Sequence, residues 1–154
     1  MIPALHAARL LFDHGFVQEQ AAIQRTLDEL HEDIIFLSFA VIRNVQTPVH
    51  REYLEKFYKE SENGMVQRSK IRAYVSQIDA EIDADSDPDA AATIYRTIYS
   101  VYSGFVHVAS PHIMELVVGD PPCFKLHGMS GTLTHEGHRY DLYNSFYRAI
   151  ISLQ

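Results

Sequence analysis

The sequence predicts a mainly α-helical bundle of about six to seven helices, with one small β-hairpin near the C-terminal third. Three observations support this fold class. Pro and Gly punctuate the chain at intervals typical of helix starts and ends, and a long segment without either carries apolar residues at helical spacing. The 154 residues are 47% hydrophobic and 21% charged, as in a globular domain. We therefore expect residues 1–154 to form a single helical domain.

The first two helices are the clearest. Pro3 can open a short helix that Gly15 ends in a left-handed cap. The segment 16–44 that follows has neither Pro nor Gly. Its apolar residues alternate at spacings of four and three, and they are Ile23, Leu27, Leu30, Ile34, Leu37 and Val41. We expect this row to face the core, and the C-terminal half of the helix to be central in it.

Three later helices begin with a capping residue followed by Pro. Thr47-Pro48 opens a helix that runs to about residue 60 and ends at Asn63-Gly64. A weaker helix covers about 65–82, Asp87-Pro88 opens one over 88–108, and Ser110-Pro111 opens a short one that Gly119 ends. Residues 123–127 and 132–134 then flank a glycine-containing turn and suggest the hairpin. The last helix, from about 135, has no stop signal before Gln154, so the chain is either whole or a piece of a longer protein.

Composition restricts the partners and the compartment. The chain has 13 Lys+Arg against 20 Asp+Glu, a formal charge of −7, which argues against DNA or broad nucleic-acid binding. Residues 43–72 are locally basic, at net +3, which is either ordinary surface charge or an anion or RNA-backbone contact. A lone Cys123 agrees with a reducing, cytoplasmic compartment, and no apolar stretch is long enough to cross a bilayer.

Most sequence motifs that carry chemistry are missing. Phosphate-binding glycine loops and the nucleophile elbow are both absent. The acidic run over 79–89 fails as a calcium loop, because Pro88 stands where a turn glycine is needed. His135-Glu-Gly-His138 is one residue short of the spacing that places two zinc-binding histidines on one helical face. We therefore expect no metal or other cofactor, although a pool of nine histidines keeps a metal site open as an alternative.

Two groups of residues are the best site candidates. On the helix over 88–108, Arg96, Ser100, Ser103 and His107 fall within about 60° of one another and form a polar stripe on an otherwise apolar helix. The stripe is either a solvent-facing strip or a seam that faces another helix, and burial of His107 separates the two. In the long helix, Arg25 and Glu29 are four residues apart and can form an ion pair. The pair is either an exposed surface pair or a buried pair that marks a functional site.

Two segments carry a family resemblance. They are Ala7-Ala8-x-Leu10-Leu11-x-x-x-Gly15-Phe16 with Ala21 and Arg25-x-x-x-Glu29, and Tyr99-x-x-x-Ser103-x-x-Val106-His107. Together they resemble the hallmarks of a family of uncharacterised, mainly bacterial all-helical domains of unknown function. The resemblance implies an all-α body in which Arg25, Glu29, Ser103 and His107 converge. Tyr99 of the second segment and Arg96 are further candidate site residues.

That family is loosely similar to HEPN-type helical domains, many of which are RNases of defence and toxin–antitoxin systems. Their catalytic Arg precedes a His by four to six residues on one helix. This chain departs from the pattern, because Arg96 precedes His107 with ten residues between them, about 16 Å along a helix axis. Arg25, from another helix, can take the role only if the fold brings it close.

Three functions follow as hypotheses. The first is a bacterial, cytoplasmic helical domain that acts by binding or dimerisation, with a homo-oligomer or a protein partner. The second is a metal-independent RNase in which His107 is the acid and base and Arg25 or Arg96 stabilises phosphate charge. The third is a metal-binding protein that uses His107, His112 and Glu29. RNA is thus a possible partner under the second hypothesis, and DNA and membranes are not expected.

Overall fold

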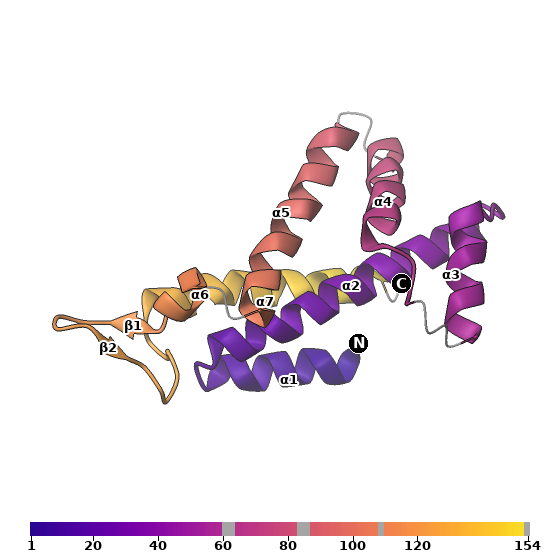
Figure 1. The fold of residues 1–154 in the computed structure, drawn as a ribbon. Coiled ribbons are helices and arrows are strands. Elements are labelled where there is room, and N and C mark those ends of the chain that lie inside the picture. The colour runs from indigo at the N-terminus through magenta and orange to yellow at the C-terminus, as the bar shows by residue number, and fades with distance from the viewer. Residues whose placement is uncertain (60–63, 83–86, 108–109, 153–154) are drawn as a thin grey trace. The chain divides into compact units, whose positions relative to one another are not determined.

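The computed structural model describes residues 1–59, 64–82, 87–107 and 110–152, and it confirms the predicted fold class (Figure 1). Seven helices and one two-stranded antiparallel hairpin make up this part of the chain. They are α1 (Ile2–Asp13), α2 (Val17–Ile42), α3 (Pro48–Tyr58), α4 (Arg68–Ile82), α5 (Pro88–Val106), α6 (Ser110–Met114), β1 (Val117–Val118), β2 (Cys123–Phe124) and α7 (Leu133–Ser152).

The helices divide into two compact units. The terminal unit contains Met1–Leu30 and Ile98–Gln154, and the central unit contains His31–Thr97. Helices α2 and α5 therefore contribute residues to both units. Each unit has a hydrophobic cluster of its own, and each is described separately below.

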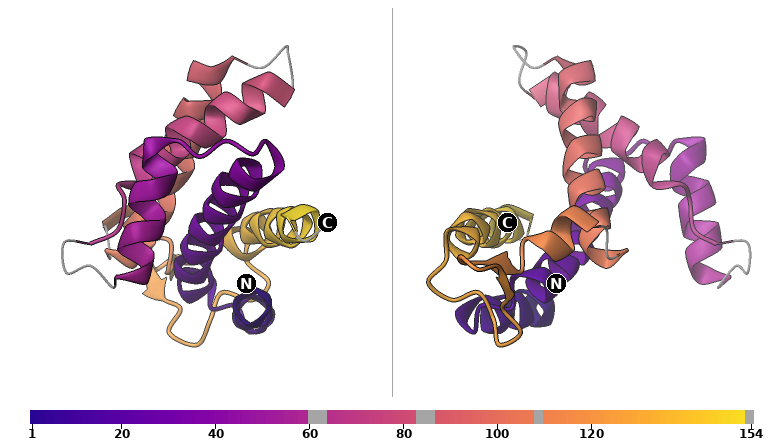
Figure 2. Two further views of the ribbon diagram at one scale, coloured as in Figure 1. Left: turned by 90° about the vertical axis from the view of Figure 1, so that its right-hand side faces the viewer. Right: turned by 60° about the vertical axis from the view of Figure 1, so that its left-hand side comes forward.

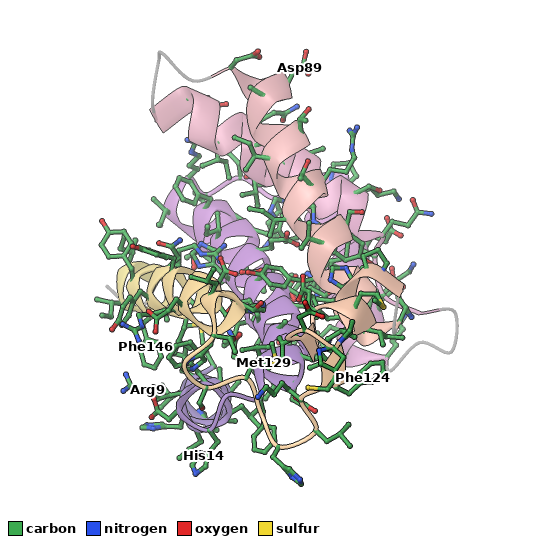
Figure 3. All side chains as sticks on the ribbon, turned by 90° about the vertical axis from the view of Figure 1, so that its left-hand side faces the viewer. Arg9, His14, Asp89, Phe124, Met129 and Phe146 are labelled. Atoms are coloured by element: carbon green, nitrogen blue, oxygen red, sulfur yellow. The ribbon has the colours of Figure 1, made fainter. Side chains whose placement is uncertain are left out.

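The core of the terminal unit lies among α1, α2 and α7 (Figures 1 and 2). Its buried members come from all three helices, and Phe146 of α7 packs against them (Figure 3). They are Leu5, Ala8, Phe12, Leu27, Leu142 and Ala149. His135 joins this layer, because its ring stacks on Phe12 with centroids 4.2 Å apart and its Nε2 lies 2.8 Å from the Phe12 carbonyl oxygen.

The loop before α7 that contains Met129 and Ser130 packs against the turn between α1 and α2 at Gly15. The Met129 amide donates to the Gly15 carbonyl oxygen at 2.7 Å, and the Met129 side chain is fully buried. Gly15 has φ +75° and ends α1 as the sequence predicts. A Cβ at Gly15 would lie 2.6 Å from Ser130 Oγ, so the close approach of the two loops requires glycine there.

The core of the central unit is built on Phe36. Its buried members come from α2, α3, α4 and the segment before α4, and they are Phe36, Tyr53, Val66, Ile71 and Val75. His50 is fully buried against Phe36, with the two rings 3.9 Å apart and nearly parallel. One His50 nitrogen lies 3.0 Å from the Phe36 carbonyl oxygen, and the other accepts from the Thr47 amide at 3.2 Å. His50 thus caps α3 and fills the core at once.

The helix boundaries follow the predicted punctuation with local differences. Thr47 caps α3, and the Asp87 carboxylate accepts from the Asp89 amide at 3.0 Å at the start of α5. The expected stop at Asn63 and the middle of the acidic run, 83–86, lie outside the described residues. Helix α6 ends at Met114, well before Gly119, because the chain there enters the hairpin.

The hairpin pairs different residues from those expected. Val117 pairs with Phe124 and Val118 with Cys123, so the turn spans residues 119–122. Residues 132–134, expected as the second strand, instead lead into α7, where the Thr132 hydroxyl accepts from the His135 amide at 3.2 Å. Thr132 is therefore the N-cap of the last helix.

The inner face of α2 differs from the predicted apolar row. Val41 is 79% exposed, whereas Gln24 is fully buried. Leu27 is the one member of the predicted row that is buried, whereas Ile23, Leu30, Ile34 and Leu37 are half-buried. Phe36 and Ala40, which were expected to widen the apolar face, are buried. The helix buries polar side chains because partners on α7 satisfy them, which apolar spacing alone does not reveal.

Candidate functional site

The Arg25 side chain of α2 is the centre of a polar cluster with α5. Its Nη2 donates to the Tyr99 hydroxyl at 2.9 Å, and its Nη1 lies 3.4 Å from Ser103 Oγ. Its Nε lies 3.3 Å from a Glu29 carboxylate oxygen. The guanidinium carbon is also 4.7 Å from the centroid of the Tyr99 ring. Four of the six predicted site residues thus converge in the terminal unit.

Helical geometry explains why these four residues meet. Arg25 and Glu29 are one turn apart on α2, and Tyr99 and Ser103 are one turn apart on α5, so each pair presents both side chains on one helix face. The Arg25 and Glu29 side chains are 20% and 27% exposed, so the cluster is partly buried. The two hydroxyls and the aromatic ring orient the guanidinium, and Glu29 neutralises part of its charge.

His107 and Arg96 are placed differently from this cluster. The His107 amide donates to the Ser103 carbonyl oxygen at 3.0 Å, so His107 follows Ser103 by one further turn. Its side chain is exposed, as are those of Ser100 and Arg96. The predicted polar stripe is therefore mostly a solvent-facing strip, and only Ser103 points to another helix. Arg96 lies about 10 Å from Ser103 along the α5 axis, so Arg25 is the arginine next to Ser103.

A second polar group, which sequence reasoning missed, links α2 to α7. The Gln24 amide donates to Asp28 Oδ1 at 3.3 Å and to the Ser145 hydroxyl, and Arg148 forms a salt bridge with Asp28. Asp28 Oδ2 is buried and has no hydrogen-bond partner among the described residues. Burial raises the pKa of Asp28, against the opposing effect of Arg148.

Helix α5 adds Tyr102 to this polar interior. Tyr102 is 8% exposed, and its pKa is raised mainly by burial and secondly by the negative charge of the nearby Asp141. The sequence signal was the repeat of polar residues every four positions in α2, at Gln20, Gln24 and Asp28, which places them on one helix face. Their partners are more than a hundred residues away in the chain, so the sequence alone does not identify them.

His112 of α6 and His138 of α7 both lie near the Glu115 carboxylate. His112 Nδ1 lies 3.8 Å from one Glu115 oxygen, and His138 Nε2 lies 3.9 Å from the other. The second His138 nitrogen lies 3.2 Å from Gln20 Oε1. Burial lowers the pKa of His138, although Asp141 and Glu115 oppose the shift.

The geometry gives the metal-binding alternative no support. Within the described ranges, no group of three or more His, Cys, Asp or Glu side chains is placed to hold a metal ion. Of its proposed ligands, Glu29 pairs with Arg25 and His107 is exposed. His112 is held elsewhere, with its ring 4.0 Å from that of Phe105.

The basic segment over 43–72 is largely neutralised within the central unit. Six of its seven cations have carboxylate partners within 4.0 Å, and these six are Arg43, Lys56, Lys59, Arg68, Lys70 and Arg72. Arg68 makes two contacts with Asp33, at 2.5 and 3.0 Å, and Arg72 lies 2.7 Å from buried Glu32. The structure therefore favours ordinary paired surface charge over an RNA-backbone contact here.

In the described part of the chain, no helix combines the length and the apolar character needed to cross a membrane. The side chain of Cys123 is exposed and is a free thiol.

Comparison with known proteins gives no relative from which to take a role for the Arg25 cluster. No family model, no curated protein and no solved structure matches this chain.

Proposed function

We propose that this chain is a bacterial, cytoplasmic helical domain that binds a phosphate-bearing ligand, with single-stranded RNA as the ligand to test first. The observation that carries the proposal is the Arg25 guanidinium, which two hydroxyls and a tyrosine ring hold in the terminal unit. The free thiol of Cys123 agrees with a reducing compartment.

The chemistry of the cluster suits a phosphate oxygen. A guanidinium presents N–H groups in a fixed plane, and the Tyr99 and Ser103 hydroxyls can turn to donate when an anion arrives. Glu29 neutralises part of the positive charge, which limits affinity for anions in general. The remainder of the molecule is acidic, so binding depends on this one site rather than on a broad basic surface.

Titration of a fluorescein-labelled 20-nucleotide RNA, read by fluorescence anisotropy, tests the proposal. Arg25→Gln is expected to weaken binding by about tenfold or more, because a charge-assisted hydrogen bond is lost. Arg9→Gln is the matched control: it removes the same charge from an exposed pair with Asp13, also four residues apart, and should leave affinity within about twofold. Equal losses in both variants, or no binding by the wild type, would overturn the proposal.

A second candidate is a metal-independent RNase, and the position of His107 favours it. Its exposed imidazole follows Ser103, the Arg25 contact, by one helical turn. In this candidate the exposed His107 imidazole is the proton-transfer group, and Arg25 stabilises the developing phosphate charge. Arg25, rather than Arg96, then takes the arginine role.

Cleavage of a panel of single-stranded RNAs in the presence of EDTA tests this candidate. His107→Ala should abolish cleavage and leave the melting temperature nearly unchanged, because the side chain is exposed. His127→Ala, at another exposed histidine, should retain cleavage. An inactive wild type, or an active His107→Ala protein, excludes the RNase candidate without affecting the binding proposal.

A further inference from the structure

Helix α7 has a buried inner face of mixed polarity and an exposed outer face that is apolar. The inner face lies in the terminal unit, and its buried residues are His135, His138, Leu142, Ser145 and Ala149. Its outer face carries large apolar side chains that are more than half exposed. They are Leu133 at 92%, Tyr140 at 73%, Tyr143 at 56%, Tyr147 at 66%, Ile150 at 58% and Ile151 at 51%. At 100° per residue these six side chains fall within an arc of about 100°.

The apolar residues of the outer face follow the seven-residue repeat by which two helices pack along each other. Leu133, Tyr140 and Tyr147 are seven residues apart, and Tyr143 and Ile150 occupy the alternate position of the same repeat. A repeat of seven with two apolar positions is the pattern by which one helix packs along another. Single exposed apolar residues are ordinary, but a continuous row of this length is typical of an interaction surface.

The charges around the row favour a second copy of this chain as the occupant. Among the described residues of the arc, Glu136 is the one charged side chain, and Arg139 neutralises it at 2.8 Å. Asp28 pairs with Arg148 at one flank of the helix. The face is therefore close to neutral although the chain carries −7, so two copies can approach here without facing like charges. A strongly basic or acidic partner would find little to pair with.

The size of the row also fits a pair of identical helices. The exposed parts of three tyrosines, two isoleucines and one leucine amount to roughly 600 Å² per copy that pairing can cover. Two copies would bury about 1,200 Å², the lower end of stable specific interfaces. Tyrosine is enriched in such interfaces, and its hydroxyls can hydrogen-bond at the edge.

We propose that two copies of this chain associate through the outer face of α7, defined by Leu133, Tyr140, Tyr143, Tyr147, Ile150 and Ile151. The interface is isologous, because both copies use the same patch. The dimer is held by burial of the tyrosine and isoleucine row, and the Glu136–Arg139 pair lies within the face near its N-terminal end. This association uses none of the residues of the Arg25 cluster, so it stands or falls independently of the proposed function.

Sedimentation velocity of the whole chain over about 1–200 μM tests the proposal. The wild type should sediment as a species of twice 17.6 kDa, with a dissociation constant in about the micromolar range. Raising NaCl from 0.05 to 0.5 M should leave the dimer intact, because its interface is apolar and salt screens the repulsion between acidic copies.

The double variant Tyr140→Glu/Tyr147→Glu places like charges on both copies within the row and should raise the dissociation constant at least about a hundredfold. Tyr58→Glu is the matched control, because Tyr58 of α3 is 78% exposed in the central unit; this variant should dimerise as the wild type does. Circular dichroism should show folded protein in all cases, since the substituted side chains are exposed. A monomeric wild type at 200 μM, or an unchanged dimer in the double variant, refutes the proposal.

Discussion

Buried histidines in this protein act as structural groups, and one of them makes stability depend on pH. His138 is 8% exposed and contacts Gln20, and burial lowers its pKa below the value of 6.5 for a free side chain. The unfolded chain therefore takes up a proton at this position more readily than the folded chain. Stability from the neutral imidazole is complete above pH 6.5 and declines as the pH falls below it.

We expect the free energy of unfolding to decrease when the pH is lowered from about 7.5 to about 5.5. His138→Gln keeps a polar side chain of similar size but does not titrate, so its unfolding free energy should fall less over the same range. Urea denaturation at closely spaced pH values measures both slopes. Identical slopes in the two proteins would show that His138 does not carry this dependence.

Two helical glycines should respond to alanine in opposite directions. A Cβ at Gly104 of α5 would overlap Nε2 and Cδ2 of the His112 ring, whereas a Cβ at Gly137 of α7 meets nothing within 4 Å. Gly104→Ala should lower the melting temperature, because displacing His112 outweighs the gain of about 1 kcal/mol in helix propensity. Gly137→Ala should raise it by a few degrees. Thermal unfolding at one protein concentration gives the melting temperatures of the wild type and both variants. A higher melting temperature in both variants would show that the His112 ring can move away from a Cβ at position 104 at little cost.

At the scale of elements, helix boundaries could be predicted because Pro, Gly and capping residues act locally. Thr47, Asp87 and Gly15 mark helix ends through contacts within a few residues. The inner face of α2 could not be predicted in this way. Gln24 is buried there because it hydrogen-bonds to Ser145, which comes from the other end of the chain. The same limit applied to the candidate site: the family resemblance grouped Arg25 with Ser103, but the polar repeat of α2 did not identify Arg148 as the partner of Asp28.

The polar contact between α2 and α7 should behave as a coupled pair. Gln24→Leu removes the donor to Ser145 and Asp28 inside a buried region, and we expect a loss of about 2 kcal/mol in unfolding free energy. Combining it with Ser145→Ala should cost less than the sum of the single changes by about 1 kcal/mol, because the double variant has no Ser145 hydroxyl left without its Gln24 donor. Denaturant unfolding of the four proteins closes the cycle. Strict additivity would show that the contact contributes nothing specific.

For the whole molecule, the two hydrophobic cores raise the question of how far cooperativity extends along the chain. A chain of 154 residues predicts one domain, whereas the structure has one core around Leu142 and another around Ile71, each 1% exposed. Helices α2 and α5 run through both units, so they alone can transmit a loss of stability along continuous backbone. If each core is a separate cooperative unit, damage to one stays local.

Leu142→Ala and Ile71→Ala distinguish these cases, because each deletes a comparable buried side chain at a cost of about 2–5 kcal/mol. We expect Leu142→Ala to accelerate amide hydrogen exchange in α1 and α7, and Ile71→Ala to accelerate it in α3 and α4. In α2, residues before and after Leu30 should respond to different substitutions, because the boundary between the units falls there. Exchange measured by mass spectrometry on peptides from each helix resolves this. Equal acceleration in all helices by either substitution would show that both cores unfold together, because the free energy of global unfolding would then set every exchange rate.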